Sequence, residues 1–204
     1  TGATASGEEI PDFESADAVP WAEFKPYINV VTMQRISRIG NYTFSGLEKI
    51  QTISIVSPLT SIGSYAFDGC TSLAAFTLPT TLSSMGEYAF RGTAVKTITI
   101  PEKLLAIPAG AFAGCSELAT LTVHNAITEI GDYAFENTSI ALISLPESLT
   151  KIGAGAFKNC KLLTAITSNA VEIGAEAFDG CELLSSANIA ANLEILGDYA
   201  FRGT

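Results

Sequence analysis

The chain repeats one short motif at almost constant spacing, and this repetition constrains its fold more than any other feature. Eight phenylalanines lie 21 to 23 residues apart: Phe44, Phe67, Phe90, Phe112, Phe135, Phe157, Phe178 and Phe201. Seven of them follow an alanine, and seven carry a glycine four positions earlier, with Pro108 as the exception. Periods of roughly 20–50 residues are typical of solenoids, in which each copy forms one turn. The spacing therefore predicts eight stacked turns.

The residues between the phenylalanines predict the shape of one turn. After each of the first seven comes the pattern apolar-x-x-apolar-x-apolar, for example Leu73, Phe76 and Leu78. The alternation in its second half has the period of a half-buried strand. Asn41 and its equivalents, which follow the repeated glycine, can cap a short helical turn that carries Ala-Phe. A Gly or Asn two positions past each Phe, such as Gly46, tolerates the left-handed backbone that ends such a turn.

One turn departs from the others. The spacing from Phe157 to Phe178 is the shortest of the seven, at 21 residues. The same turn places the polar Ser168 and the small Ala170 at positions that are apolar in other turns. We therefore expect a local kink or extra mobility there, because fewer apolar contacts hold that turn in place.

The turns resemble the BspA-like class of leucine-rich repeats, whose consensus is close to Cys-x-x-Leu-x-x-Ile-x-Leu-Pro-x-x-Leu-x-x-Ile-Gly-x-x-Ala-Phe. Residues 70–90 read CTSLAAFTLPTTLSSMGEYAF, and the similarity covers roughly Ile36 to Thr204. It implies an α/β repeat fold: a right-handed leucine-rich-repeat solenoid with a parallel sheet on the concave face and short helical turns or irregular crossings on the convex face. It also implies a bacterial protein, secreted or lipid-anchored, of a host-associated anaerobe, with adhesion or host-protein binding as the recurring role.

The repeats divide the chain into two expected parts. Residues 1–35 form an acidic capping segment, and its stretch IPDFESADAVPW (residues 10–21) is similar to a lead-in common in that family. We expect Phe13 and Trp21 to cover the edge of the first turn. Residues 36–204 form a solenoid of about eight turns, with the last turn incomplete. This predicts either a truncated chain or an end covered by a partner copy or an unusual cap.

Charge and hydropathy exclude several classes of partner. The chain has 21 acidic and 11 basic residues, a net charge of −10. A surface of this sign repels the phosphates of nucleic acids and anionic lipids, so neither is an expected partner. No apolar run approaches the ~18 residues that a membrane-spanning helix needs, so we expect no membrane insertion by this segment.

Outward positions of the predicted strands form one candidate contact surface. Residues at the same place in successive turns face the same way. One such position gives what we call the hydroxyl stripe: Ser54, Thr77, Thr99, Thr122, Ser144, Thr167 and Asn188. His124 lies beside it, and Leu142 belongs to the neighbouring row. The stripe is either ordinary strand surface, which suits Thr and Ser, or a weakly charged groove for an extended partner. It lacks the Tyr, Trp and Arg that anchor most binding hot spots.

Tyrosines suggest a second candidate surface. A tyrosine stands two residues before Phe in five turns, three of them consecutive, at Tyr42, Tyr65 and Tyr88. We expect these rings on the convex side, stacked into an aromatic strip. The strip has two interpretations: rings that shield the turns beneath them, or a contact surface for a partner.

No catalytic or metal-binding constellation can be assembled from the sequence. The cysteines Cys70, Cys115, Cys160 and Cys181 occupy one position of the repeat, at spacings that match no zinc motif. We expect buried, reduced thiols, although Cys160 and Cys181 lie on adjacent turns within disulfide range. His124 is the only histidine, and no nucleophile and base can be paired with it. We therefore expect no enzyme activity, no cofactor and no bound metal.

Two functional hypotheses follow. The leading one is an extracellular or cell-surface protein–protein interaction module, for which the family resemblance implies adhesion or the binding of a host extracellular-matrix or plasma protein. Its contact surface would be the hydroxyl stripe or the tyrosine strip. The alternative is a structural spacer within a larger surface protein, without a ligand of its own.

Overall fold

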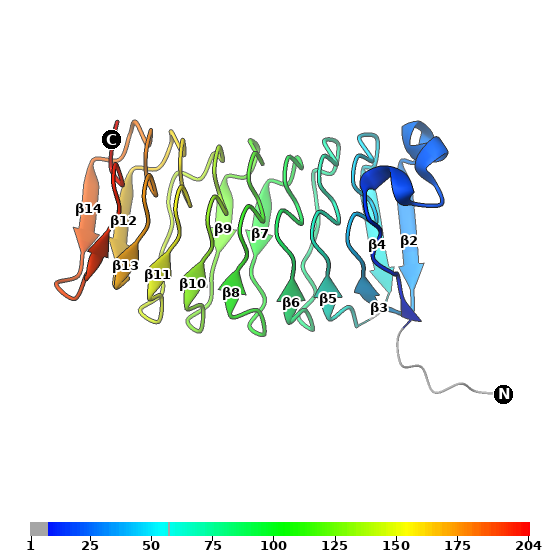
Figure 1. Ribbon diagram of the computed structural model, residues 1–204, viewed down its shortest axis with the longest axis horizontal. Coiled ribbons are helices and arrows are strands. Elements are labelled where there is room, and N and C mark those ends of the chain that lie inside the picture. Colours follow the sequence, from blue (N-terminus) through cyan, green and yellow to red (C-terminus); the bar gives the residue numbers. More distant parts are fainter. Residues whose placement is uncertain (1–7, 57) are drawn as a thin grey trace.

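The computed structural model describes residues 8–56 and 58–204, and it shows one stack of parallel turns (Figure 1). Residues 1–7 of the expected capping segment lie outside the described residues. All strand pairs are parallel, and the strands form two sets that stack turn upon turn. The solenoid predicted from the spacing is therefore correct. Seven complete turns connect the eight phenylalanines.

The first set, which we call the short-strand set, ends in most turns at the aliphatic residue before the repeated glycine. It forms two sheets, β1-β3-β5-β6 and β8-β10-β11-β13-β15. Its strands are β1 (Glu8–Glu9), β3 (Ile36–Ile39), β5 (Ser61–Ile62), β6 (Ser84–Met85), β8 (Ala106–Ile107), β10 (Glu129–Ile130), β11 (Lys151–Ile152), β13 (Glu172–Ile173) and β15 (Ile195–Leu196). The sequence pattern did not predict this set, because two residues are too few to show a period.

The second set, the long-strand set, is the sheet that the alternation predicted. Its strands are β2 (Val30–Gln34), β4 (Thr52–Val56), β7 (Thr97–Thr99), β9 (Thr120–Thr122), β12 (Ala165–Ser168) and β14 (Ser186–Ile189). They pair as β2-β4, β7-β9 and β12-β14 rather than as one continuous sheet. The interruptions fall at residues 74–78 and 142–145, which form no strand.

A column of phenylalanine rings runs through the core. Each of the seven consecutive pairs stacks, with ring centroids 4.9 to 5.6 Å apart and ring planes within 21° of parallel. The six rings from Phe67 to Phe178 are completely buried. Aliphatic residues such as Leu73 and Ile152 surround the column and are equally buried. Every turn thus contributes one ring to a core that no single turn could close.

The turns that carry Ala-Phe bond to one another and are not helical. We expected short helical turns here. Instead, the amide of each of the first seven phenylalanines donates to the carbonyl of the residue before the next one, as from Phe135 N to Ala156 O at 2.8 Å. Within the described residues, the helices are the 3-10 segments η1 (Ala16–Ala18) and η2 (Ala22–Tyr27), ahead of the repeats. An amide bonded to the next turn is not available to a helix, so stacking replaces helix formation.

The hydrogen bonds between successive turns form what we call the inter-turn ladder, and the polar residue after the repeated glycine adds to it. Oδ1 of Asn41 accepts the Ser64 N–H at 2.8 Å, and Oδ1 of Asp132 accepts the Ala154 N–H at 2.8 Å. The predicted caps of helices within the same turn are therefore wrong, since these side chains bind the next turn. The left-handed backbone predicted two residues past each Phe is present in all eight turns, with φ between 57° and 75°.

The one proline in the glycine position interrupts the short-strand set. A Cβ atom at Gly86 would lie 2.3 Å from the Ser64 nitrogen of the preceding turn, so a side chain there cannot be accommodated. Pro108 puts a ring at the equivalent position and has no N–H to donate, whereas Gly86 N donates to Ile62 O at 2.8 Å. The sheet accordingly stops at β6 and starts again at β8.

The shortened turn keeps its pairing. Ser168 and Ala170 are buried, and the Ser168 hydroxyl accepts the Ala170 N–H at 3.1 Å. The pairs β12-β14 and β11-β13 run without a register shift, so strand pairing shows no kink there. A polar residue is tolerated in the apolar slot because its hydroxyl is satisfied within the same turn.

The segment before the repeats forms an irregular turn of the same stack. Strand β1 pairs with β3, and β2 pairs with β4 over five residues. Trp21 takes the place of a phenylalanine: its ring stacks on Phe44 at 6.1 Å, its Nε1 donates to the Thr43 carbonyl, and Phe13 packs edge-on against it at 5.7 Å. The ladder therefore begins some thirty residues before the first repeated motif, at Glu8.

The phenylalanine column generates a stability prediction. Phe135→Ala removes a fully buried ring between two stacked neighbours, and we expect a loss of about 3–5 kcal/mol in the free energy of unfolding. Urea denaturation followed by circular dichroism measures it. The matched control is Leu162→Ala, at a side chain that is 47% exposed, with an expected change within about 0.5 kcal/mol. Equal stability of the two variants would contradict the stacking register.

Candidate interaction surfaces

All seven side chains of the hydroxyl stripe are exposed. Strand pairing places neighbours of the stripe opposite each other, as in Thr99 with Thr122 and Thr167 with Asn188. The same register adds Thr32 of β2, opposite Ser54, which the repeat pattern did not include. The stripe thus presents hydroxyl and amide groups at one turn spacing, which suits hydrogen bonding to an extended polar partner.

The two interruptions of the long-strand set contain the stripe residues Thr77 and Ser144, and each lines a hollow. One hollow, of about 350 Å³, lies over residues 74–78 and includes Thr77 and Lys96. The other, of about 920 Å³, includes Ser144 and Thr167. The side chain of Leu142 also lines it and is 70% exposed. Leu142 is a large apolar side chain, which the stripe itself lacks. In the sequence, Leu142 differs from the other residues of its row, which are all small.

His124 lies at the rim of the stripe and is held by two hydrogen bonds. Its Nδ1 accepts the Ala126 N–H at 3.2 Å, so its Nε2 is the nitrogen that donates to the Leu104 carbonyl, at 3.1 Å. The ring is only partly exposed. In other turns a proline, such as Pro101, occupies this place, and His124 fixes the same bend through its side chain.

The tyrosine strip is a stack of rings in a strained backbone position. Tyr42 and Tyr65 have centroids 5.0 Å apart, and Tyr65 and Tyr88 have centroids 5.1 Å apart. All three residues have φ of 55° to 58°, a left-handed conformation that costs a side-chain-bearing residue roughly 1–2 kcal/mol. The strip ends at Gly110, where a Cβ atom would lie 2.1 Å from the Tyr88 ring. The rings therefore cover the backbone of the following turn.

Arginine side chains pack over the tyrosine rings. The guanidinium of Arg91 lies 5.4 Å from the Tyr65 ring centroid and 5.2 Å from that of Tyr88. Its Nε and Nη2 donate to the two carboxylate oxygens of Asp68, at 2.7 and 2.8 Å, and this hydrogen bonding raises the pKa of Arg91. Arg202 repeats the arrangement over Tyr199, bound to Asp179. Side chains committed to such contacts are less available to a partner.

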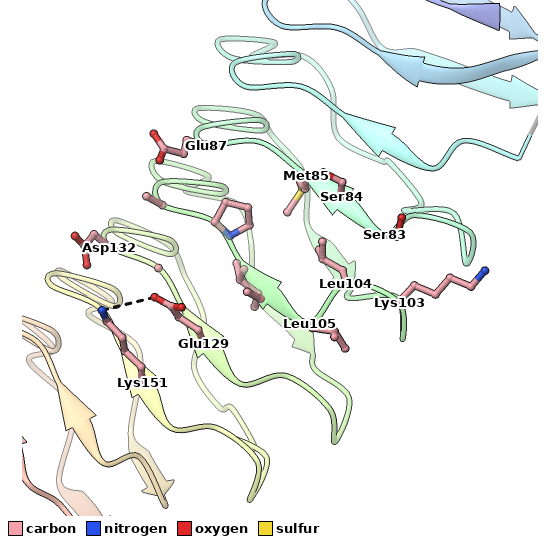
Figure 2. Close-up of a pocket in the computed structure, with 15 residues that line it drawn as sticks. Ser83, Ser84, Met85, Glu87, Lys103, Leu104, Leu105, Glu129, Asp132 and Lys151 are labelled. Carbon is pink, nitrogen blue, oxygen red and sulfur yellow. Dashed lines mark ion pairs between the residues drawn. The ribbon is translucent and has the colours of Figure 1, made fainter. Parts of the chain in front are cut away.

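A third hollow opens where Pro108 breaks the short-strand set (Figure 2). It measures about 570 Å³ and lies between β6 and the strands β8, β10 and β11. Figure 2 shows Lys151 beside Glu129, with an ion-pair distance of 3.7 Å. Lys151 also lies 3.7 Å from Glu172 of the next turn. The paired charges leave this hollow without a dominant charge that would select a ligand.

The four cysteines are free and buried, as predicted. Each thiol donates to the carbonyl of a phenylalanine in the preceding turn, as from Cys70 to Phe44 at 3.1 Å and from Cys181 to Phe157 at 3.1 Å. Burial raises the pKa of Cys70 to about 12 and that of Cys115 to about 11. Residues 8–56 and 58–204 contain no cluster of three His, Cys, Asp or Glu side chains that could hold a metal ion.

Comparison with known families identifies the repeats. Residues 37–164 and 164–204 match the family model described as BspA type Leucine rich repeat region, with six copies. A comparison with curated proteins gives no match. None of the helices in the described part of the chain is long and apolar enough to cross a membrane.

Among solved structures, the chain is similar to a leucine rich cell surface protein from Faecalibacterium prausnitzii, with a TM-score of 0.71 and 21% sequence identity. The alignment covers 95% of this chain and 62% of that protein, so the chain spans less than two thirds of its length. Weaker likenesses are to a leucine-rich repeat protein from Bacteroides ovatus (TM-score 0.41, 22% identity, 86% and 64% covered) and to the pneumococcal vaccine antigen PcpA (0.49, 16%, 93% and 60%). The first likeness shows the solenoid fold.

Burial of the thiols predicts their reactivity. Because the raised pKa keeps each thiol neutral and the core keeps it covered, we expect no alkylation by iodoacetamide in the folded protein at pH 8. Unfolding in urea should expose all four cysteines, each gaining one adduct in the intact mass. An adduct in the folded state would contradict this burial. A mass two daltons low before unfolding would show a disulfide instead.

Proposed function

This chain belongs to the BspA-type leucine-rich-repeat family, and from that premise we propose that it is a protein-interaction module displayed at a bacterial cell surface. Solenoids of this kind typically offer extended binding surfaces. We assign the contact to the hydroxyl stripe, and the proposed partner is a host extracellular-matrix or plasma protein bound during adhesion. The cell-surface location of the similar Faecalibacterium protein supports the proposed location.

The observation that carries the proposal is the exposure of every stripe residue, together with the hollow lined by Leu142 and by the stripe residues Ser144 and Thr167. Exposed hydroxyls can exchange hydrogen bonds with water for hydrogen bonds with a partner at little desolvation cost. Leu142, an exposed leucine in a hollow, adds apolar surface that a partner can bury, which favours association. The tyrosine strip is the weaker candidate, because its rings already pack on each other and under Arg91.

Charge introduced into the stripe tests this assignment. The double variant Thr99→Asp, Thr122→Asp places two carboxylates at adjacent exposed positions. We expect at least a tenfold loss of affinity for whichever member of a panel of purified extracellular-matrix and plasma proteins the parent binds. A buried unpaired charge costs more than the roughly 1–3 kcal/mol of an unpaired neutral polar group. Surface plasmon resonance measures it.

The matched control is Thr80→Asp, an exposed threonine on the crossing between strands and outside the stripe, with an expected change below about twofold. If the double variant binds with the affinity of the parent chain, the contact does not lie on this face. A folded parent chain that binds no member of the panel would contradict the adhesion role and favour a spacer.

A further inference from the structure

Among the described residues, the first turn of the stack has an open edge. Strand β2 lies at one end of the long-strand set (Figure 1), and β4 is the one described strand that pairs with it. In a parallel pair only part of each strand's backbone N–H and C=O groups face the neighbour, so the remaining groups of β2 point away from the stack. An edge of this kind is a template for pairing with another extended chain.

An apolar hollow of about 410 Å³ adjoins this edge. Its lining is almost entirely apolar and includes Trp21, Ile28, Val30, Val31, Met33 and Phe44. Met33 and Phe44 are core residues, so the hollow reaches the end of the hydrophobic core. Val30 lies at its rim with 62% of its surface exposed. In the next strand of the stack, the corresponding edge of β4 is covered by β2 of the preceding turn.

The segment around the hollow is acidic. Residues 8–38 contain six acidic residues against Lys25, Arg35 and Arg38, a net charge of −3. Asp12 and Asp17 face Arg38 and Lys25. Within residues 8–56 and 58–204, no ion pair engages the glutamates of this segment: Glu8, Glu9, Glu14 and Glu23.

From these features we propose that this end of the solenoid binds an extended peptide that alternates aliphatic residues and carries Lys or Arg at its flanks. Its backbone adds to the free edge of β2, as in other peptides bound by strand addition. One aliphatic side chain fills the hollow against Trp21, Val31 and Met33. The basic flanks meet the unpaired glutamates, and exposed Tyr27, 78% accessible beside Ile28, offers a ring face to a cation.

Charge favours such a peptide over a second copy of this chain. Another copy docked edge to edge would bring its own acidic segment against this one, and like charges across an interface oppose association. A basic peptide removes that repulsion and accelerates encounter at low salt. Apart from the backbone of Thr32 in β2, this inference uses no residue of the hydroxyl stripe. Its test is therefore separate from the test of the proposed adhesion surface.

The test uses the peptide KKVTVTVKK and the fluorescence of Trp21, which is the only tryptophan and lines the hollow. We expect a saturable blue shift of its emission, weakened as sodium chloride is raised. Val30→Lys places a like charge at the rim and should raise the Kd at least fivefold, at roughly a 1 kcal/mol cost per close like-charge pair. The matched control is Val56→Lys, a valine of the next strand with 64% exposure, which should change the Kd by less than about twofold.

Two further peptides check the chemistry. EEVTVTVEE tests the charge, and KKVTVTVKK N-methylated at its valines and threonines tests the strand addition, so both should bind at least tenfold more weakly. Equal binding of either, or no saturable shift up to about 1 mM KKVTVTVKK, would overturn the proposal. So would a concentration-dependent dimer in sedimentation that Val30→Lys abolishes, because a second copy would then occupy the hollow.

Discussion

The rest of the structure depends on one contact between turns: the amide of each repeated phenylalanine donates to the carbonyl of the residue before the next, while the two rings stack. The hydrogen bond fixes the distance between successive turns, and the ring stack buries the apolar surface that a single turn would expose to water. Because both act between neighbours, stability accumulates along the stack as a series of nearest-neighbour interfaces. The similar geometry of successive turns follows from this repeated contact.

The ladder explains which positions tolerate little variation within this chain. Ala stands before Phe because its methyl is buried against the next turn, and Ala66 through Ala177 are completely inaccessible. Gly stands four residues before Phe because a Cβ would collide with the backbone of the preceding turn. Where Pro108 replaces it, the short-strand sheet breaks and a hollow opens. Outward positions carry no such constraint, so the surfaces that contact partners can vary while the stack is preserved.

Much of the fold could be predicted from the sequence, whereas most features that could not be predicted arise from contacts between turns. The 21 to 23 residue period, the family and the buried thiols follow from residues that recur, and recurrence is visible in a string of letters. The predicted helical turns are wrong because the Phe135 amide bonds to the next turn, and the local sequence carries no sign of that bond. Tyr65 in a left-handed conformation, the Asn41 bond to Ser64 and the breaks at residues 74–78 also arise between turns. The exposed Leu142 and the apolar hollow beside β2 required the packed structure, because a hollow is defined by what surrounds it.

The most direct test of this account is the through-hydrogen-bond scalar coupling between the amide nitrogen of Phe112 and its acceptor carbonyl, measured by NMR on labelled protein. The hydrogen bond between turns predicts a coupling to the carbonyl carbon of Ala134, 22 residues along the chain, where the N to O distance is 2.9 Å. A coupling to the carbonyl of Pro108, four residues earlier, would show an α-helical turn. That result would show that the turns are not joined by the hydrogen bonds on which the stack depends.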